Sequence, residues 1–366
     1  VGARQVGKST LLRGLPKYRY LSFDDQGLAA LAERNPTQVL EPPCILDEAQ
    51  KAPALFDAVK LDVDREKKPG KFIITGSVRF SKRTLIRESL TGRAKTIQML
   101  PLTVSESLAL DFEDRWVAKK LDHTRVSRKD LLRYLGRGGL PAIFAARSQA
   151  ETASYWNSLI ESAVYRDLLL AVPQGAKPAL AFAALRAIAE ILALGEAPTF
   201  ARILKKTGGT RGTLERHLQG MEDMMILHRL SHWDASRTKD VLMPFDPAFF
   251  LTLLKVDSPL HDSAVHEACL HITLINEAMA NAQASDRPID LRYARSPTGE
   301  TIHLIDASRP KPIFWKISED VAPHSYSLRF LLLLAEKNKG SARVLSASDR
   351  PSQDGKLLSL PWEWVL

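Results

Sequence analysis

Residues 2–9 carry the glycine, lysine and hydroxyl groups with which a phosphate-binding loop holds a nucleoside triphosphate. They read Gly2-Ala3-Arg4-Gln5-Val6-Gly7-Lys8-Ser9, the spacing at which backbone N–H groups and the start of a helix face phosphate oxygens. We expect Lys8 to reach the β and γ phosphates of Mg-ATP and to assist catalysis, and Ser9 to ligate magnesium. Thr10 completes the predicted nucleotide-binding residues.

Two adjacent carboxylates follow further along the chain. Cys44-Ile45-Leu46-Asp47-Glu48 is a short apolar stretch that ends in an acidic pair, as in the strand that completes an ATPase site. Asp47 would hold magnesium, directly or through water. Glu48 would polarise the attacking water in hydrolysis. A solvated surface Asp-Glu pair is the alternative.

Further catalytic candidates follow the next apolar stretch. Ser77, or second to it Thr75, would sense the γ-phosphate from the end of a neighbouring strand; a plain strand-to-loop turn is the alternative. Arg93 is the candidate arginine finger, an arginine that enters a neighbour's nucleotide site and stabilises transition-state charge. Arg79 is the second choice, and ordinary surface arginines are the alternative.

The pattern of apolar and polar residues predicts the elements that position these groups. Strand-like and helix-like stretches alternate, which favours an α/β fold with a parallel P-loop sheet, its first strand truncated to Val1. We place the end of this ATPase core at residue 105. The predicted strands are 18–23, 44–46, 72–75 and 94–100, and the predicted helices are 26–34, 53–66 and 81–90.

The next two segments read as helical modules. Residues 106–172 are rich in helix formers and predict a helical lid, from which Arg166 would contact nucleotide or form a salt-bridged helix surface. Residues 173–233 predict a winged helix, with helices at 179–194, 199–206 and after Gly209, and a strand at 226–230. On its third helix we expect an exposed face with Arg211, Arg216 and His217. This module would contact double-stranded DNA or serve only for packing.

The composition is compatible with an anionic partner and with a reducing compartment. The chain has 366 residues, a net charge of +9 and a pI near 9.5, which favours nucleic acid beyond the nucleotide; solvated basic faces are the alternative. Two distant cysteines, Cys44 and Cys269, give no disulfide framework. The apolar runs are too short to cross a membrane. We therefore expect a cytoplasmic protein.

Taken together, the motifs resemble those of a known family, the prokaryotic AAA-type P-loop ATPases that carry a C-terminal domain of unknown function. The similarity runs from Val1 to Leu360-Pro361-Trp362, and it is strongest over the first 110 residues or so and again at the predicted winged helix. The motifs are Gly2 to Ser9, Ile45-Leu46-Asp47-Glu48-Ala49-Gln50, Thr75-Gly76-Ser77, Leu90 to Arg93, Leu100-Pro101-Leu102, Gly138 to Pro141 and Tyr165-Arg166-Asp167-Leu168.

The resemblance also implies a restriction-endonuclease-like fold for residues 234–366. A helix glutamate, an acidic strand residue and a Glu-x-Lys strand would then be expected, and Glu267 matches the first. However, His303 stands in place of the acidic residue and Phe314 in place of the second glutamate, although Lys316 is kept. Without those carboxylates Mg²⁺ lacks an oxygen shell. We expect this domain to be catalytically inactive.

A metal site on the histidine-rich helix is also not expected. His266 and His271 are five residues apart, which turns their side chains about 140° apart around a helix. The sequence thus favours Mg-dependent ATP binding and hydrolysis that drives a conformational switch, with DNA as an expected partner. The alternative is a nucleotide-gated scaffold that binds a protein partner with little turnover. A homo-oligomer or a complex with a protein partner is expected as the assembly.

Overall fold

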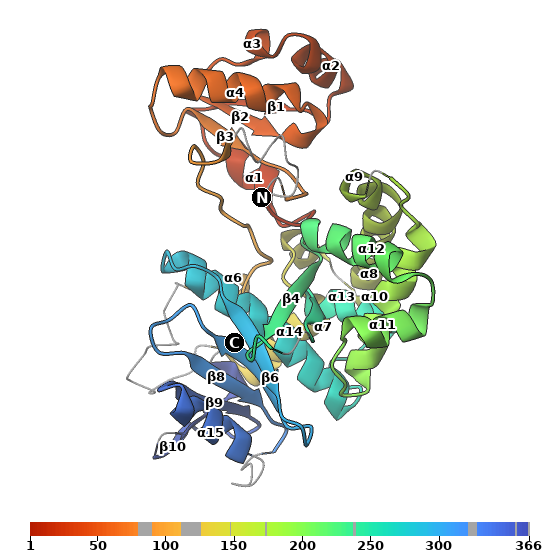
Figure 1. Cartoon of the computed structure of the whole chain (residues 1–366), viewed down its shortest axis with the longest axis vertical. Helices are drawn as coiled ribbons and strands as arrows, with labels where there is room; N and C mark the ends of the chain where they lie inside the picture. The colour runs from red at the N-terminus through yellow and green to blue at the C-terminus, as the bar shows by residue number, and fades with distance from the viewer. Residues whose placement is uncertain are drawn as a thin grey trace.

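The molecule has three parts along its long axis. Figure 1 shows a small N-terminal α/β domain at one end, a helical body next to it and a large sheet at the other end. Within the described residues, no helix is both long and apolar enough to cross a membrane. The computed structural model describes residues 1–79, 90–110, 126–146, 148–172, 174–236, 239–320, 328–355 and 357–364.

The N-terminal domain is built on a parallel sheet of three strands, in the order β1-β2-β3. They are β1 (Arg19–Ser22), β2 (Cys44–Asp47) and β3 (Phe72–Ile74). The central strand β2 is buried along its whole length, and its Cys44 lies opposite Arg19 and Phe72. Since the strands are parallel, their carboxyl ends meet at one edge. The predicted parallel α/β sheet is confirmed.

Short helices cover this sheet, and each predicted helix that the structure describes is present. The Asp25 carboxylate caps α2 by accepting hydrogen bonds from the amides of Gly27 (2.8 Å) and Leu28 (3.1 Å), which have no partner within the helix. The predicted helix at 81–90 lies, apart from Leu90, outside the described residues. The elements are α1 (Lys8–Arg13), α2 (Gln26–Arg34), α3 (Pro36–Val39), the 3-10 turn η1 (Ala49–Lys51) and α4 (Ala54–Arg65).

The strand predicted at residues 94–100 is wrong. In this fully described segment only Met99 pairs, through a single parallel bridge to Gly2. The segment instead docks on helix α14 (Ser263–Ala284). The Gln98 amide donates to Gln283 Oε1 at 2.9 Å, and Gln283 Nε2 donates to the Gln98 carbonyl at 2.7 Å. A side chain therefore takes the backbone groups that a strand would use.

One hydrophobic core holds the helical body together. It runs from Val104 to Trp362, so that it includes residues of the large sheet, and it also contains Val78 and, from the predicted phosphate loop, Ala3 and Val6. The described part of residues 106–172 is helical and shares this core with the later helices; the predicted domain limits stay predictions. The helices are α6 (Val104–Ser107), α7 (Arg128–Arg137), η3 (Pro141–Ala145), α8 (Gln149–Ser162), the π-helical turn η4 (Ala163–Asp167), α9 (Leu168–Ala171), α10 (Pro178–Ala193), α11 (Phe200–Thr207), α12 (Arg211–Asp223), α13 (Pro247–Leu254) and α14.

The third part is a mixed sheet in the order β10-β11-β9-β8-β7-β6-β4-β5. The strand predicted as a wing, β4, pairs with β5 in an antiparallel manner and with β6 in a parallel manner. It therefore continues into this sheet. The remaining elements are β4 (Leu227–His232), β5 (Val241–Pro244), β6 (Leu291–Arg295), β7 (Thr301–Asp306), β8 (Ile313–Ile317), α15 (Arg329–Lys337), β9 (Ser341–Ser346), β10 (Ser352–Asp354), β11 (Leu357–Pro361) and η5 (Trp362–Trp364).

A buried carboxylate ties the glycine-rich turn after α7 to the start of α13. Asp246 is fully buried and accepts hydrogen bonds from the amides of Gly139 and Ala248, each at 2.8 Å. A Cβ at Gly138, whose φ is +83°, would lie 2.3 Å from this carboxylate. Burial raises the pKa of Asp246 to about 6, against the opposing effect of the amides. The glycines of this turn thus make room for a structural carboxylate.

We expect Asp246→Ala to lower the free energy of unfolding by about 3 kcal/mol, because it removes a helix cap and leaves buried amides without acceptors. Urea denaturation measures this. The loss should be larger at pH 5 than at pH 7, since a carboxyl with a raised folded pKa contributes stability that fades as pH rises toward about 6. The exposed Asp257→Ala is the control and should change stability by less than about 0.5 kcal/mol. Equal losses in both variants would contradict the role of Asp246.

Candidate functional site

The predicted phosphate loop makes a tight turn directly before α1. Gln5 and Gly7 have left-handed backbones, with φ of 68° and 92°, and Gly7 immediately precedes the helix. A Cβ at Gly2 would lie 2.6 Å from the carbonyl oxygen of Met99. Packing therefore requires glycine at position 2, and backbone conformation favours it at position 7. A turn of this kind lets backbone amides face an anion at a helix start.

Lys8 is folded back onto the loop. Its Nζ donates to the carbonyl oxygens of Gly2 and Ala3, both at 2.8 Å, and the residue is 8% exposed. Burial lowers the pKa of Lys8, while the nearby carboxylates of Glu48 and Asp47 oppose that shift. The ammonium group thus occupies the concave side of the turn, close to both predicted acidic residues.

Ser9 and Asp47, the two predicted magnesium ligands, are in direct contact. Ser9 Oγ donates to Asp47 Oδ2 at 2.7 Å, and the hydroxyl of Tyr20 on β1 donates to the same oxygen. Asp47 is 2% exposed, and its Oδ1 has no hydrogen-bond partner among the residues that the structure describes. A buried carboxylate oxygen without a partner is costly. A hard cation beside Ser9 would satisfy it.

Glu48 leaves β2 with a left-handed backbone, φ 54°, which turns its side chain away from the strand line. Its carboxylate accepts hydrogen bonds from Gln50 Nε2 and from Ser77 Oγ, the latter at 3.1 Å. The backbone of Thr75 holds the turn by accepting from the Ala49 amide at 3.1 Å. The structure thus brings Ser77 next to Glu48, whereas Thr75 contributes its backbone.

Arg93 lies away from these groups. Its guanidinium pairs with Asp64 in the last turn of α4 through two contacts, Nε–Oδ1 at 2.7 Å and Nη2–Oδ2 at 2.9 Å. At the same end of α4, Glu66 pairs with Lys71, which directly precedes β3, at 3.0 Å. That end therefore lies by the amino ends of the strands, opposite Asp47. Within one chain, Arg93 is not part of the predicted site.

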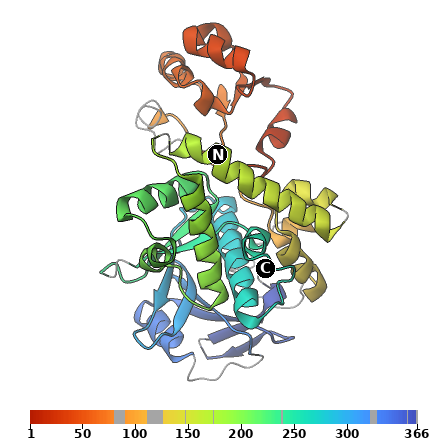
Figure 2. The same ribbon diagram turned by 90° about the vertical axis from the view of Figure 1, so that its right-hand side faces the viewer.

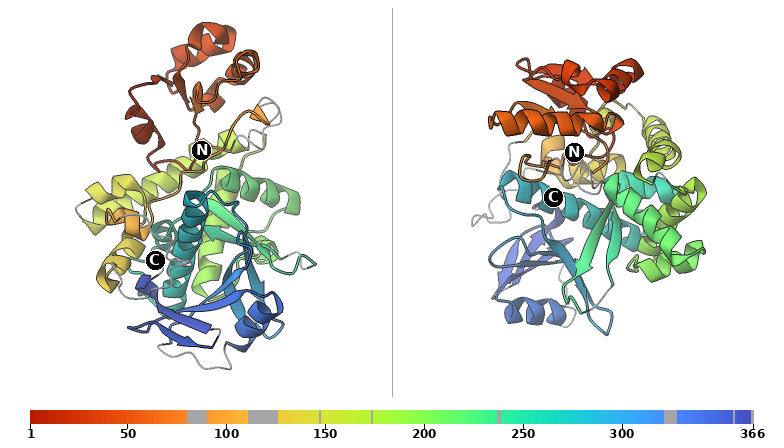
Figure 3. Two further views of the ribbon diagram at one scale, coloured as in Figure 1. Left: turned by 90° about the vertical axis from the view of Figure 1, so that its left-hand side faces the viewer. Right: turned by 45° about the horizontal axis from the view of Figure 1, so that its top comes forward.

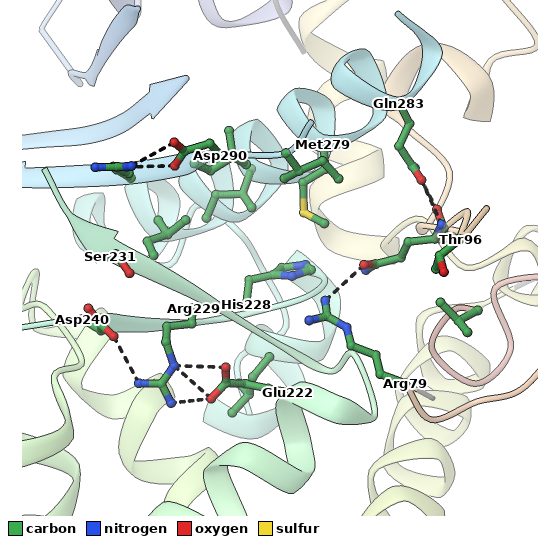
Figure 4. Close-up of a pocket in the computed structure, with 18 of the residues that line it drawn as sticks. Arg79, Thr96, Glu222, His228, Arg229, Ser231, Asp240, Met279, Gln283 and Asp290 are labelled. Carbon is green, nitrogen blue, oxygen red and sulfur yellow. Dashed lines mark hydrogen bonds and ion pairs between the residues drawn. The ribbon is translucent and has the colours of Figure 1, made fainter. Parts of the chain in front are cut away.

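Arg79 lines a large hollow between β4, α14 and residues 90–98, and Figure 4 shows it there beside His228. The hollow has a volume of about 1190 Å³. Arg79 Nη2 donates to Gln98 Oε1 at 3.1 Å. Burial, and then the nearby Arg79, lower the pKa of His228 to about 4. Among the described lining residues, none comes from the loop at 2–9 or from Asp47 and Glu48.

The helical body touches the loop through α8 and the turn that follows it. Figure 2 shows α8 running across the body directly below the N-terminal domain, and the left view of Figure 3 shows α1 at the junction between the two. Arg4 Nε lies 2.7 Å from Asp167 Oδ2. Burial raises the pKa of Asp167, and Arg4 opposes that shift. The neighbouring Arg166 is exposed.

One of the expected recognition-helix residues does not face solvent. On α12, Arg211 and Arg216 are exposed, but His217 is fully buried. His217 Nε2 accepts a hydrogen bond from the Lys177 amide at 2.7 Å. The prediction of an exposed His217 is wrong, because the residue follows Leu214 by three positions and thus shares its buried face.

The polar residues of the C-terminal domain are engaged with one another. His303 Nε2 lies 3.0 Å from Glu267 Oε1, and His303 Nδ1 accepts from the Ile317 amide at 3.1 Å. Phe314 is fully buried in an apolar cluster. His266, next to Glu267 in the sequence, has its own carboxylate partner: its Nδ1 lies 2.8 Å from Glu319 Oε1. Over the described residues, no three His, Cys, Asp or Glu side chains are grouped to hold a metal.

Two residues of the site were missed by the sequence analysis in these roles. Tyr20 reaches Asp47 from the adjacent strand, and the Arg13 guanidinium lies 5.0 Å from its ring centre. Asp167 belongs to a motif quoted for the family resemblance, but its contact with the loop was not foreseen. For Tyr20, its place in a predicted strand was the available signal, although the pairing of that strand with β2 could not be known.

Comparison with known proteins supports the assignment of the N-terminal domain. Residues 1–108 match a family described as an AAA domain, and residues 128–259 match a domain of unknown function. Uncharacterized proteins of Mycobacterium bovis and Mycobacterium tuberculosis are each 27% identical over 247 residues, which is 64% of this chain. The chain spans about half the length of these curated relatives, with 49% of each covered.

A solved structure, the Walker-type ATPase PABY2304 of Pyrococcus abyssi, is similar at a lower level. It is 16% identical with a TM-score of 0.39, and the match covers 69% of this chain and 89% of that one. This likeness is too weak to define a shared fold. The phosphate-loop turn at residues 2–9 and the three-stranded parallel sheet both lie within the segment that matches an AAA domain.

Proposed function

We propose that the chain is a Mg²⁺-dependent ATPase whose nucleotide cycle switches the helical body. The carrying observation is the contact between the loop and the central strand, Ser9 Oγ to Asp47 Oδ2 at 2.7 Å. This contact joins Ser9, which is predicted to ligate magnesium, to Asp47, which is predicted to hold the same ion. Gly2 to Ser9, with Thr10, would bind the triphosphate, as the resemblance to AAA-type ATPases implies.

The donor atoms fit magnesium. Ser9 offers a hydroxyl oxygen and Asp47 a buried carboxylate with one oxygen unpartnered, and hard oxygen ligands with room for water are what Mg²⁺ prefers. When bound there, the ion would neutralise charge on the β and γ phosphates. Tyr20 would hold the Asp47 carboxylate in position through its hydrogen bond to Oδ2.

The remaining groups divide the catalytic work. Lys8 would leave the carbonyls of Gly2 and Ala3 to reach the phosphates, with which an ammonium pairs more strongly. Glu48 would accept a proton from the attacking water. Ser77, which donates to Glu48 at 3.1 Å, would orient that carboxylate and sense the γ-phosphate.

Arg93 would act on a neighbour. In its own chain it is bound to Asp64 at the opposite end of the sheet, so a role as arginine finger requires a second copy or a partner to place it in another nucleotide site. The same observation favours the second candidate function, a nucleotide-gated scaffold that turns over slowly until a protein partner completes the site.

The helices after residue 172 support a winged helix that binds double-stranded DNA. Thr199 forms an antiparallel bridge to Val241. This isolated bridge joins the residue before α11 to the β4-β5 hairpin, a contact between helix and wing that a winged helix would also make. Lys205 and Arg216 are exposed on α11 and α12.

We further propose residues 106–172 as a lid, residues 234–366 as an inactive nuclease-like domain, and a cytoplasmic location.

Two substitutions separate binding from turnover. Lys8→Ala should abolish ATP binding, because the loop loses its phosphate-seeking cation, whereas Glu48→Gln should bind ATP and lose at least about 100-fold in hydrolysis. Equilibrium binding of a fluorescent ATP analogue and phosphate release measure the two effects. Tight binding by the first variant, or full turnover by the second, would contradict the proposed site.

Tyr20→Phe should lower the apparent affinity for Mg²⁺ about tenfold, since an oriented outer ligand commonly contributes this much. The measurement is ATP hydrolysis at saturating ATP over a range of Mg²⁺. Tyr18→Phe is the matched control, because the Tyr18 hydroxyl donates to the Gly70 carbonyl at 3.0 Å on the surface. If both variants follow the wild-type Mg²⁺ curve, Tyr20 does not support the metal site.

Double-stranded DNA should bind with an affinity that falls steeply as salt is added. The charge reversals Lys205→Glu and Arg216→Glu together should reduce the slope of log affinity against log salt by about 2, and DNA should stimulate ATP hydrolysis. Lys67→Glu with Lys68→Glu, at exposed positions after α4, makes the same change in charge elsewhere and should leave the slope unchanged. Equal losses in the two pairs would reject the winged-helix contact, and no DNA binding in dilute buffer would favour the scaffold.

A further inference from the structure

One cation of the phosphate loop is held by the helical body. Arg4 lies inside the loop, and its Nε is 2.7 Å from Asp167 Oδ2 at the end of the π-helical turn η4. The Asp167 side chain is 5% exposed and that of Arg4 is 25% exposed. The contact is therefore an ion pair largely removed from water, between the loop and a helix far along the chain.

The pair is not well satisfied. Within the described parts of the chain, Arg4 Nε has no aligned hydrogen-bond acceptor, and Asp167 Oδ1 is buried without a hydrogen-bond partner. A buried ion pair repays the desolvation of its charges only where geometry is good and the remaining atoms are hydrogen-bonded. A stronger anion beside Arg4 would therefore compete effectively with Asp167.

Asp167 lies where the loop and the catalytic candidates meet. A small cavity of about 10 Å³ is bordered by Arg4, Asp167 and Ser77, and Ser77 donates to Glu48. Asp167 is also the last residue of a π-helical turn, an irregularity frequent at functional sites. Ser77 thus contacts Glu48 and borders the same small cavity as Arg4 and Asp167.

Both cations of the loop are bound to acceptors of the protein: Lys8 to the carbonyls of Gly2 and Ala3, and Arg4 to Asp167. A triphosphate is a better partner for both, and the planar guanidinium is well suited to phosphate oxygens. We propose that Asp167 is the competitor of the nucleotide for Arg4. Binding of the triphosphate transfers Arg4 from Asp167 to phosphate, and the freed turn η4 reports nucleotide occupancy to the helical body.

This inference rests on the proposed function. It is tested by whether each variant binds ATP more tightly or more weakly than the wild type. Asp167→Asn keeps the shape but removes the competing charge, so it should tighten binding of a fluorescent ATP analogue with Mg²⁺ about fivefold or more. Arg4→Gln should weaken binding. In the Arg4→Gln background, Asp167→Asn should have no effect. A merely structural pair predicts weaker binding for each variant, and that result, or unchanged binding by Asp167→Asn, would overturn the proposal.

Hydrogen exchange gives a second readout that does not depend on the Asp167 variant. In the wild type, saturating ATP should speed amide exchange in residues 159–172, and Arg4→Gln at saturating ATP should lose this change. Glu161→Gln, at an exposed position on α8, is the control and should behave as the wild type. An unaltered response in Arg4→Gln would overturn the proposal. If Lys8→Ala binds ATP normally, the proposed function itself fails; if only the Arg4 and Asp167 results fail, the site stands without this link.

Discussion

The contact on which the site depends is the hydrogen bond between Ser9, at the end of the loop and in the first turn of α1, and Asp47, at the end of the central strand. It requires that the loop and β2 meet at one edge of the sheet. The parallel arrangement of β1, β2 and β3 provides that edge, and burial of the whole of β2 fixes its position. Asp47 is then held in a dry environment, where an unpartnered oxygen has a strong preference for a cation.

The loop is shared between two parts of the molecule. Gly2 at its start forms a parallel bridge to Met99. Ala3 and Val6 are packed into the core of the helical body. The sheet whose central strand carries Asp47 packs on a separate apolar cluster around Leu46 and Phe56. Because packed interiors transmit displacement rather than absorb it, a loop that changes shape around phosphate must also displace its contacts in the body.

Local patterns predicted the turn at residues 2–9, the strands near 44–46 and 72–75, and the helices near 26–34 and 53–66, since each depends on residue types within a short window. The contacts between elements could not be predicted. Tyr20 reaches Asp47 only because β1 lies beside β2, and Arg4 meets Asp167 across a long sequence separation. The segment at 94–100 has strand-forming residues, yet Gln283 binds its backbone. His217 has a polar side chain at a position that the helix turns inward.

The continuity of β4 with the large sheet limits how the parts of the molecule can move. β4 pairs with β5 on one side and with β6 on the other, so the hairpin that would form a wing cannot swing independently of the C-terminal strands. The segment that enters from the N-terminal domain is bound at Gln98 to the end of α14. Between them lies the hollow lined by Arg79 and His228 (Figure 4). A shift of residues 90–98 relative to β4 would change the width of this hollow, because both contribute to its walls.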